Sequence, residues 1–238
     1  MLKKVMTLVL AAAASAAMAA TIHLAGDSTC ASYSAKRAPL TGWGQVLDKF
    51  TAPGVKVNNR AVSGTSTKTF MDSGLWNRML ARVQKGDYVI IQFGHNDQKS
   101  NNPKAYADAK VAYPANLRKM ISDVRAKGAT PVLATSIVRC TFRNGKLYDN
   151  GLYPYRDATF AVGKSENVAV VNLNGISEEK INAMGEEKAL QMYMYSSNVP
   201  KLKGIDKTHL TAAGAETFAK WFIDDCKAQN LPLAKCFK

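Results

Sequence analysis

Short runs of apolar and β-branched residues recur along the chain, with longer amphipathic segments between them. Such runs are typical of strands, and their alternation with helical segments is typical of a parallel sheet covered by helices. The five expected strands span residues 21–25, 55–58, 88–93, 130–137 and 168–173. The third run, YVIIQF, is apolar at nearly every position, which indicates a central strand buried on both faces.

The segments between the strands have helical spacing. In residues 113–127 the apolar positions share one face, and Gly128 follows as a stop signal. Thr211 is placed to cap the last helix, whose apolar stripe would face the core. The other expected helices span residues 44–50, 75–84, 155–165 and 177–194, the last of them interrupted at Gly185. The pattern predicts an α/β fold, a flavodoxin-like three-layer α/β/α sandwich with about five parallel strands.

The first twenty residues have the layout of a secretory signal peptide. Lys3 and Lys4 precede an apolar run over residues 5–14, and small residues precede an expected cut after Ala19 or Ala20. The apolar run is shorter than the ~20 residues that a membrane-spanning helix needs. We therefore expect a secreted or periplasmic protein with no membrane anchor after cleavage. Residues 21–238 are expected to form a single domain.

The chain is strongly basic. It has 32 Lys and Arg against 18 Asp and Glu, so removal of Lys3 and Lys4 with the leader leaves 30 − 18 = +12. Such a charge attracts polyanions. For an exported protein, which we expect to be a monomer, an acidic polysaccharide is a more natural partner than nucleic acid. Because the basic residues are scattered, a surface that only aids solubility stays an alternative.

The four cysteines are compatible with disulfides if the chain is exported. Cys226 and Cys236 bracket a short C-terminal loop and are the expected pair. Cys30 and Cys140 could pair only if their Cα atoms approach within ~7 Å, and this pairing stays open. The spacings do not resemble a zinc site, and we expect neither a metal nor a cofactor.

Polar clusters follow the predicted strands at the points where the strands end. Ser28 lies in GDSTC after the first strand, Gly64 in NRAVSGTS after the second, and Asn96 in GHNDQ after the third. Asp206 and His209 lie in DKTH, past the fifth strand. The carboxyl ends of parallel strands meet at one edge, where ligands bind. We therefore expect these five residues to gather there.

These residue types match the parts of a serine hydrolase. A serine hydroxyl needs a base to take its proton, which His209 can do, and Asp206 can fix the tautomer of that imidazole. The backbone N–H groups of Ser28 and Gly64 and the Asn96 amide can stabilise an oxyanion. Each motif alone is a common turn or surface pair, whereas their joint occurrence in this order indicates catalysis. The GxSxG elbow of α/β hydrolases is absent, and no glycine-rich phosphate loop follows the first strand.

Two further histidines complete the three in the chain. His23 lies within the first predicted strand, so we expect a core or interstrand residue. His95 adjoins Asn96 and either lines the site or bonds to the backbone, with the structural role preferred.

At the four clusters the chain resembles the SGNH or GDSL hydrolase superfamily, over about residues 22–216. More narrowly, GDST, GHND, the GWGQ segment at 42–45 and the TSIVR segment ending at Arg139 resemble the rhamnogalacturonan acetylesterase branch, carbohydrate esterase family 12. The resemblance implies the catalytic and oxyanion roles given above, and it adds Asp27, His95 and Arg139 as substrate contacts. It also implies an exported esterase that removes acetyl groups from plant cell-wall polysaccharide without a metal or organic cofactor.

The identity of the polysaccharide is less sharply indicated. Cys140 stands where the branch usually has a second basic residue, and residues 194–204 look individual to this chain. The positive charge favours a galacturonate-containing polymer such as rhamnogalacturonan or pectin. Acetylated xylan is the alternative substrate. A lipid-directed esterase and an inactive polysaccharide-binding module on the same scaffold are further alternatives.

Overall fold

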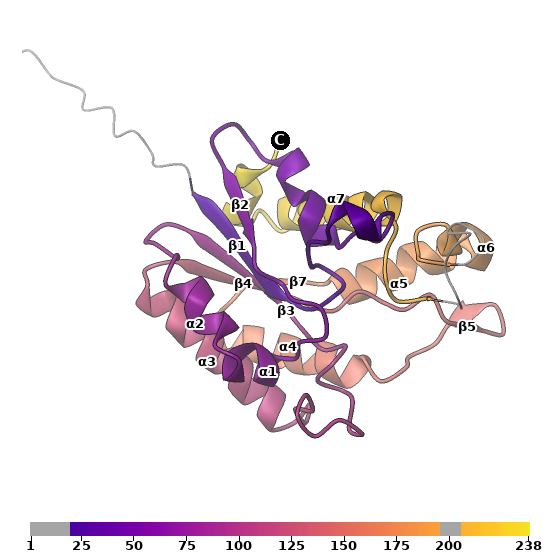
Figure 1. The fold of residues 1–238 in the computed structure, drawn as a ribbon, viewed down its shortest axis with the longest axis horizontal. Coiled ribbons are helices and arrows are strands. Elements are labelled where there is room, and N and C mark those ends of the chain that lie inside the picture. Colours follow the sequence, from indigo (N-terminus) through magenta and orange to yellow (C-terminus); the bar gives the residue numbers. More distant parts are fainter. Residues whose placement is uncertain (1–19, 196–205) are drawn as a thin grey trace, which may run out of the picture.

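A five-stranded parallel sheet forms the centre of the protein, in the order β2-β1-β3-β4-β7 (Figure 1). The computed structural model describes residues 20–195 and 206–238. The strands are β1 (Thr21–Gly26), β2 (Lys56–Asn59), β3 (Tyr88–Gln92), β4 (Thr130–Ala134) and β7 (Val170–Val171). This order is that of flavodoxin-like folds, which confirms the expected fold class.

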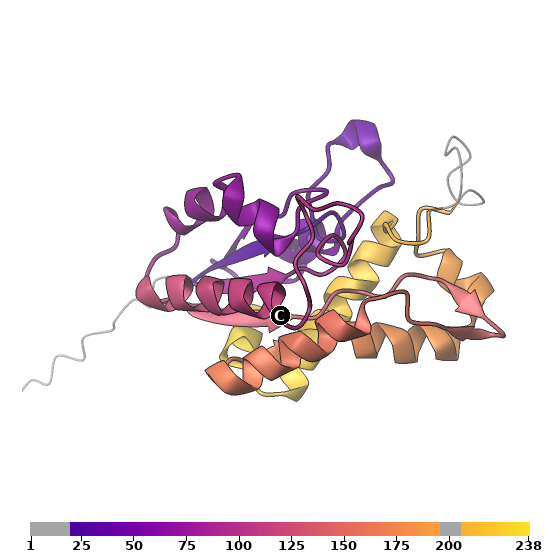
Figure 2. The same cartoon turned by 90° about the horizontal axis from the view of Figure 1, so that it is seen from below.

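Helices cover both faces of the sheet. The 3-10 helix η2 (Trp43–Phe50), α5 (Leu173–Met184) and α7 (Ala212–Ala228) pack on one face, and α1 (Thr67–Asp72), α2 (Leu75–Leu80), α3 (Ala112–Ala126) and α4 (Tyr153–Glu166) pack on the other. Figure 2 shows α3 and α4 side by side beneath the sheet. The remaining elements are η1 (Ala35–Arg37), the hairpin β5 (Phe142–Arg143) and β6 (Lys146–Leu147), α6 (Glu186–Leu190) and η3 (Pro232–Cys236).

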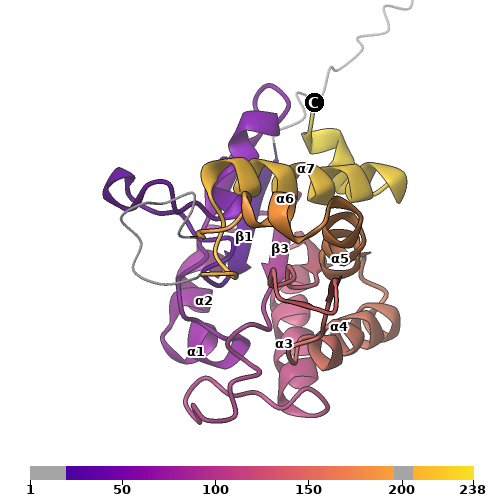
Figure 3. The same ribbon diagram turned by 90° about the vertical axis from the view of Figure 1, so that its right-hand side faces the viewer.

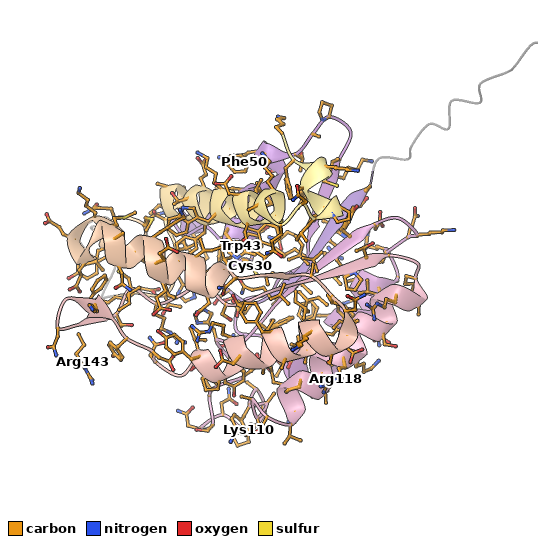
Figure 4. The ribbon with its side chains drawn as sticks, turned by 180° about the vertical axis from the view of Figure 1, so that it is seen from behind. Cys30, Trp43, Phe50, Lys110, Arg118 and Arg143 are labelled. Carbon is orange, nitrogen blue, oxygen red and sulfur yellow. The ribbon has the colours of Figure 1, made fainter. Side chains whose placement is uncertain are left out.

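The alternation of side chains along each strand separates two hydrophobic layers. Ile90 packs in the layer under α7 and η2, whereas Val89 and Ile91 pack against α2 and α3. Trp43 and Cys30 belong to the first layer (Figure 4). His23 is 1% exposed in β1, where its ring nitrogens hydrogen-bond with Asp87 and Asn58, as expected for an interstrand residue.

Several predicted boundaries were wrong. The strand expected over residues 130–137 ends at Ala134, and only Val170–Val171 of residues 168–173 form a strand. The helix expected over residues 177–194 is interrupted at Gly185, which has φ 82°, as predicted; however, α5 begins earlier, at Leu173, and α6 ends earlier, at Leu190.

The expected disulfide between Cys226 and Cys236 is not formed, and neither is the Cys30–Cys140 pairing that the sequence left open. All four cysteines are free, buried thiols. Burial raises the pKa of Cys140 and Cys226 to about 12, and it raises the pKa of Cys30 and Cys236 as well. Disulfide formation starts from the thiolate, which such surroundings disfavour.

Two expectations concern residues that the structure does not describe. The expected signal peptide would cover residues 1–20, of which only Ala20 is described, and most of segment 194–204 also lies outside the described residues. Within residues 20–195 and 206–238, no helix is long and apolar enough to cross a membrane.

Candidate active site

The carboxyl ends of β1, β2 and β3 bring three loops to one edge of the sheet, which faces the viewer in Figure 3. Gly26 is the last residue of β1, and its neighbours leave no room for a side chain. A Cβ there would lie 2.8 Å from the Gln92 carbonyl oxygen and would collide with Cys30 Sγ. Residues 28–30 form a turn just after the strand, so Ser28 lies directly beyond the carboxyl end of β1.

Ser28, His209 and Asp206 form a continuous hydrogen-bonded chain. Ser28 Oγ lies 2.9 Å from His209 Nε2, although 181 positions separate the two residues. His209 Nδ1 lies 2.7 Å from Asp206 Oδ2. The other carboxylate oxygen, Oδ1, accepts from the backbone N–H groups of Thr208 at 2.9 Å and His209 at 3.0 Å. The arrangement is that of a hydroxyl, a base and an orienting carboxylate.

Backbone contacts hold the loop that carries His209. The His209 carbonyl accepts from the Met194 N–H at 2.8 Å, and the Lys207 carbonyl accepts from the Cys140 N–H at 2.8 Å. Lys207 Nζ also pairs with Glu186 Oε1 at 3.0 Å. Just after the loop, the Thr211 side chain accepts from the Gly214 N–H at 3.2 Å and caps α7, as its sequence position predicts. The imidazole is thus anchored to elements on both sides.

The environment of Asp206 favours its carboxylate. Partial burial raises the pKa of Asp206, but the hydrogen bonds from the His209 side chain and the His209 and Thr208 N–H groups outweigh burial and lower the pKa to about 2. The group is therefore ionised at any pH above about 3. A permanent carboxylate beside Nδ1 stabilises a proton there and leaves Nε2 free to accept one from Ser28.

Three hydrogen-bond donors lie on the adjacent loops. No acceptor within residues 20–195 and 206–238 bonds the Ser28 or Gly64 N–H. Gly64 has φ 83°, a conformation that favours glycine. Asn96 Nδ2 donates to the Thr65 carbonyl at 2.9 Å and has a second N–H. Lys99 Nζ donates to Asn96 Oδ1 at 2.7 Å, which fixes the orientation of the amide.

Asp27 and His95 lie beneath the serine, where they have almost no exposed surface. Asp27 is 0% exposed, and its Oδ1 accepts from the Thr29 N–H and hydroxyl. His95 is 3% exposed, and its Nε2 lies 3.0 Å from the Ile137 carbonyl oxygen. Burial, with Arg139 and His209 nearby, holds the pKa of His95 well below its usual value, so the ring is neutral and donates through Nε2. Both positions suit support of the site better than contact with a polymer.

Arg139 is half-buried beside the hairpin β5–β6. Its Nη1 donates to Asn150 Oδ1 at 2.9 Å. With the Gln98 amide oxygen turned towards the guanidinium, Gln98 accepts from both Nη1 and Nη2 at 2.8 Å. Burial lowers the pKa of Arg139, while Asp27 raises it. Arg139 lines a small cavity with Tyr148 and Tyr153, so this side of the site has a cation and two aromatic rings.

Asp97 is a supporting residue that the sequence reasoning missed. Its Oδ1 accepts from the Thr67 N–H at 2.9 Å and the Thr67 hydroxyl at 2.5 Å, which ties the start of α1 to the loop of Asn96. Its Oδ2 is buried and has no partner among the described residues. The sequence offered two signals for this contact. An acidic residue directly follows Asn96 in GHND, and Ser66-Thr67 has the composition of a helix start.

We expect Asp97→Asn to change how stability depends on pH. Burial, opposed by the Thr67 hydrogen bonds and reinforced by Asp27, raises the pKa of Asp97 from 3.8 to about 7. Between about pH 4 and pH 7 the folded state therefore holds a proton that the unfolded state releases, so this stabilisation falls as pH rises. The variant cannot titrate. Its unfolding free energy relative to wild type should rise by about 2 kcal/mol from about pH 5 to about pH 8.

Urea unfolding at the two pH values measures this difference. The exposed Asp48→Asn serves as the control, because its side chain has no hydrogen bond or ion pair within the described part of the chain. Parallel stability curves for wild type and Asp97→Asn would show that Asp97 is ionised in the folded protein throughout this range.

The described residues contain no group of three His, Cys, Asp or Glu side chains that could hold a metal ion.

The geometry can be compared directly with known proteins. The GDSL-like lipase/acylhydrolase family matches residues 24–217 of the chain. The match includes all five residues that gather at the sheet edge, namely Ser28, Gly64, Asn96, Asp206 and His209.

Individual relatives agree with this assignment. The probable rhamnogalacturonan acetylesterase YesY and the rhamnogalacturonan acetylesterase RhgT, both from Bacillus subtilis (strain 168), are each 34% identical over 218 residues. The alignments cover 92% of this chain and 97% of YesY, and 89% of this chain and 91% of RhgT. The crystal structure of YxiM from Bacillus subtilis has a TM-score of 0.78 at 28% identity, over 90% of this chain and 58% of that one. With this site at the edge of this sheet, the chain belongs to the GDSL-like lipase/acylhydrolase family.

Proposed function

We propose that the protein is a serine esterase that removes O-acetyl groups from an acidic plant cell-wall polysaccharide, rhamnogalacturonan or a related pectin. The observation that carries the reaction type is the contact of 2.9 Å between Ser28 Oγ and His209 Nε2. The substrate class is supported by the two relatives, which are named as rhamnogalacturonan acetylesterases. The net charge of 30 − 18 = +12 that is left without Lys3 and Lys4 favours a polyanionic substrate over a neutral one.

In the first step Ser28 Oγ attacks the acetyl carbonyl carbon, and its proton moves to His209 Nε2. Asp206 keeps the proton on Nδ1 and stabilises the imidazolium that forms. The Ser28 N–H, the Gly64 N–H and the free N–H of Asn96 donate to the oxyanion, and one such donor lowers the barrier by about 3 kcal/mol. The bond from the carbonyl carbon to the sugar oxygen then breaks, and His209 Nε2 protonates that oxygen.

In the second step water completes the reaction. His209 Nε2, now neutral, takes a proton from a water molecule that attacks the acetyl group on Ser28. The bond to Ser28 Oγ breaks, Oγ takes the proton from the imidazolium, and acetic acid leaves and ionises to acetate in water. Every proton transfer uses the same nitrogen, so no other titrating side chain is required.

The reaction is proposed to take place outside the cytoplasm. Residues 1–20 have the charged, apolar and small-residue parts of a leader, and their removal would leave the domain over residues 21–238. Plant cell-wall polymers are too large to enter a cell, so an enzyme that acts on them intact has to be exported. Mass spectrometry of the protein from the culture medium would give the cleavage point, and an intact N-terminus would contradict export through this leader.

Acetate release from two polymers tests the substrate. We expect acetylated rhamnogalacturonan to be deacetylated about ten times faster than acetylated xylan in ~0.01 M salt, where charges act over about 30 Å. In ~1 M salt, where the Debye length is about 3 Å, the preference should largely disappear. Xylan is nearly neutral and serves as the control for general salt effects. A preference for xylan, or a pectic preference that salt does not weaken, would contradict the electrostatic argument.

A further inference from the structure

A groove adjoins the Gly64 loop on the β2 side of the site. Its volume is about 320 Å³. It is lined by Ser32, Asn59, Arg60, Ala61, Val62, Leu75 and Arg78. These residues come from three segments: the loop after Ser28, the loop that runs from the end of β2 towards Gly64, and α2.

The groove wall is bonded to the loop of the candidate nucleophile. Asn59 Nδ2 donates to the Cys30 carbonyl at 2.7 Å and to Ser32 Oγ at 3.1 Å. The Val62 N–H donates to the Gly26 carbonyl at 3.0 Å. The groove wall and the Ser28 loop are therefore held together by hydrogen bonds.

Two arginines line this groove without an acidic partner. Among the described residues, neither Arg60 nor Arg78 has a carboxylate within ion-pair distance. Arg78 Nη1 donates to the Ser73 carbonyl at 3.2 Å, which holds the guanidinium but does not neutralise it. On the neighbouring helices α3 and α4, by contrast, Arg118 pairs with Glu166 and Arg156 with Asp157 (Figure 4 labels Arg118).

Paired unneutralised guanidinium groups in a groove favour a carboxylate, which arginine binds through two parallel N–H donors. A neutral sugar has no group that uses this charge. An apolar acyl chain would offer neither cation a partner. The Ser32 hydroxyl also lines the groove; it accepts from Asn59 Nδ2 and keeps its own O–H for a sugar hydroxyl.

We propose that this groove is a subsite for the carboxylate of a uronic acid residue in the same polymer chain as the acetylated sugar whose ester meets Ser28. The proposal rests on the proposed function and adds the residues that select an acidic polymer. Arg60 and Arg78 act on substrate binding and not on the chemical step, so their effect depends on the charge of the substrate.

The test uses Arg78→Gln and Arg60→Gln, with Arg82→Gln as the matched control. Arg82 is exposed, lies two residues after α2 and does not line the groove. Its replacement by Gln removes the same charge as the groove variants do. For acetylated rhamnogalacturonan oligosaccharides, each groove variant should lower kcat/KM about five-fold through KM. The double variant should lower it about twenty-fold, with most of the salt dependence lost.

Two neutral substrates complete the design. Acetylated xylo-oligosaccharides and p-nitrophenyl acetate should be hydrolysed at wild-type rates by the three single variants and the double variant, which also shows that these variants are folded. Arg78→Lys, which retains charge but not the paired donors, should lie between wild type and Arg78→Gln.

The outcomes separate the two proposals. If wild type releases no acetate from the pectic oligosaccharides, the proposed substrate is wrong and the subsite falls with it. If wild type is active but the groove variants match Arg82→Gln, only the subsite is wrong. Equal losses on pectic and neutral substrates would also overturn it, because the arginines would then act through the structure of the loop.

Discussion

Replacing Ser28 with alanine is expected to lower kcat for p-nitrophenyl acetate by about 10⁶-fold, the scale on which serine hydrolases lose activity without the nucleophile. The variant keeps the oxyanion donors and the imidazole, but His209 Nε2 no longer faces the hydroxyl that lies 2.9 Å away in the structure. No acetyl-enzyme can form. The rate of p-nitrophenol release, measured at high enzyme concentration, gives the residual activity.

The controls for Ser28→Ala come from the same structure. Ser34→Ala removes an exposed hydroxyl six residues away that makes no side-chain hydrogen bond at the start of η1, and it should match wild type. His209→Ala should lose about as much as Ser28→Ala, and the double variant should be no worse than either, because the two groups act as a unit. Equal rates for wild type and Ser28→Ala would end the serine esterase proposal.

The position of the site could be predicted because it depends on topology. Parallel strands end at one edge, so a polar cluster after each strand already implies that Ser28, Gly64 and Asn96 gather. The prediction of His209 did not depend on a preceding strand. It follows from the shortage of histidines and from Asp206 three residues before it, and the structure brings both to the same edge.

The elements that the sequence did not predict are those that local sequence patterns do not encode. Helix α1 has six residues, too few to show a helical period, and it is specified by the capping box of Ser66 and Thr69. The run VAVVNL is apolar enough for a strand of six residues. However, Asn172 Oδ1 accepts from the Gly175 N–H and starts α5 at Leu173, so β7 ends after Val171.

The contacts that support the site join residues far apart in the chain. Asp97 bonds to Thr67, 30 positions before it, and nothing in either motif names the other. The groove with Arg60 and Arg78 likewise depends on how α2 packs beside the loop after β2. The free cysteines show the same limit, because spacing along the chain does not determine which thiols meet.

Asp206→Asn is expected to lower kcat/KM by about 10⁴-fold, the size of effect that follows when the orienting carboxylate of such a relay becomes an amide. The direction follows from the two carboxylate oxygens. Oδ1 accepts from the Thr208 and His209 N–H groups, so the amide oxygen of the variant has to occupy that place. The amide nitrogen then faces His209 Nδ1 and donates to it. The imidazole proton moves to Nε2, which can no longer accept the proton of Ser28.

The change of tautomer can be measured directly, and a variant that only lost packing around His209 would not show it. Nitrogen NMR of His209 should show the proton on Nδ1 in wild type and on Nε2 in Asp206→Asn, at unchanged melting temperature. Because the pKa of Asp206 is about 2, the carboxylate that holds the Nδ1 proton stays ionised at any pH above about 3. Asp48→Asn, an exposed substitution of the same kind, should keep full activity. An Asp206→Asn variant within tenfold of wild type, or one that keeps the proton on Nδ1, would show that the base does not depend on this carboxylate.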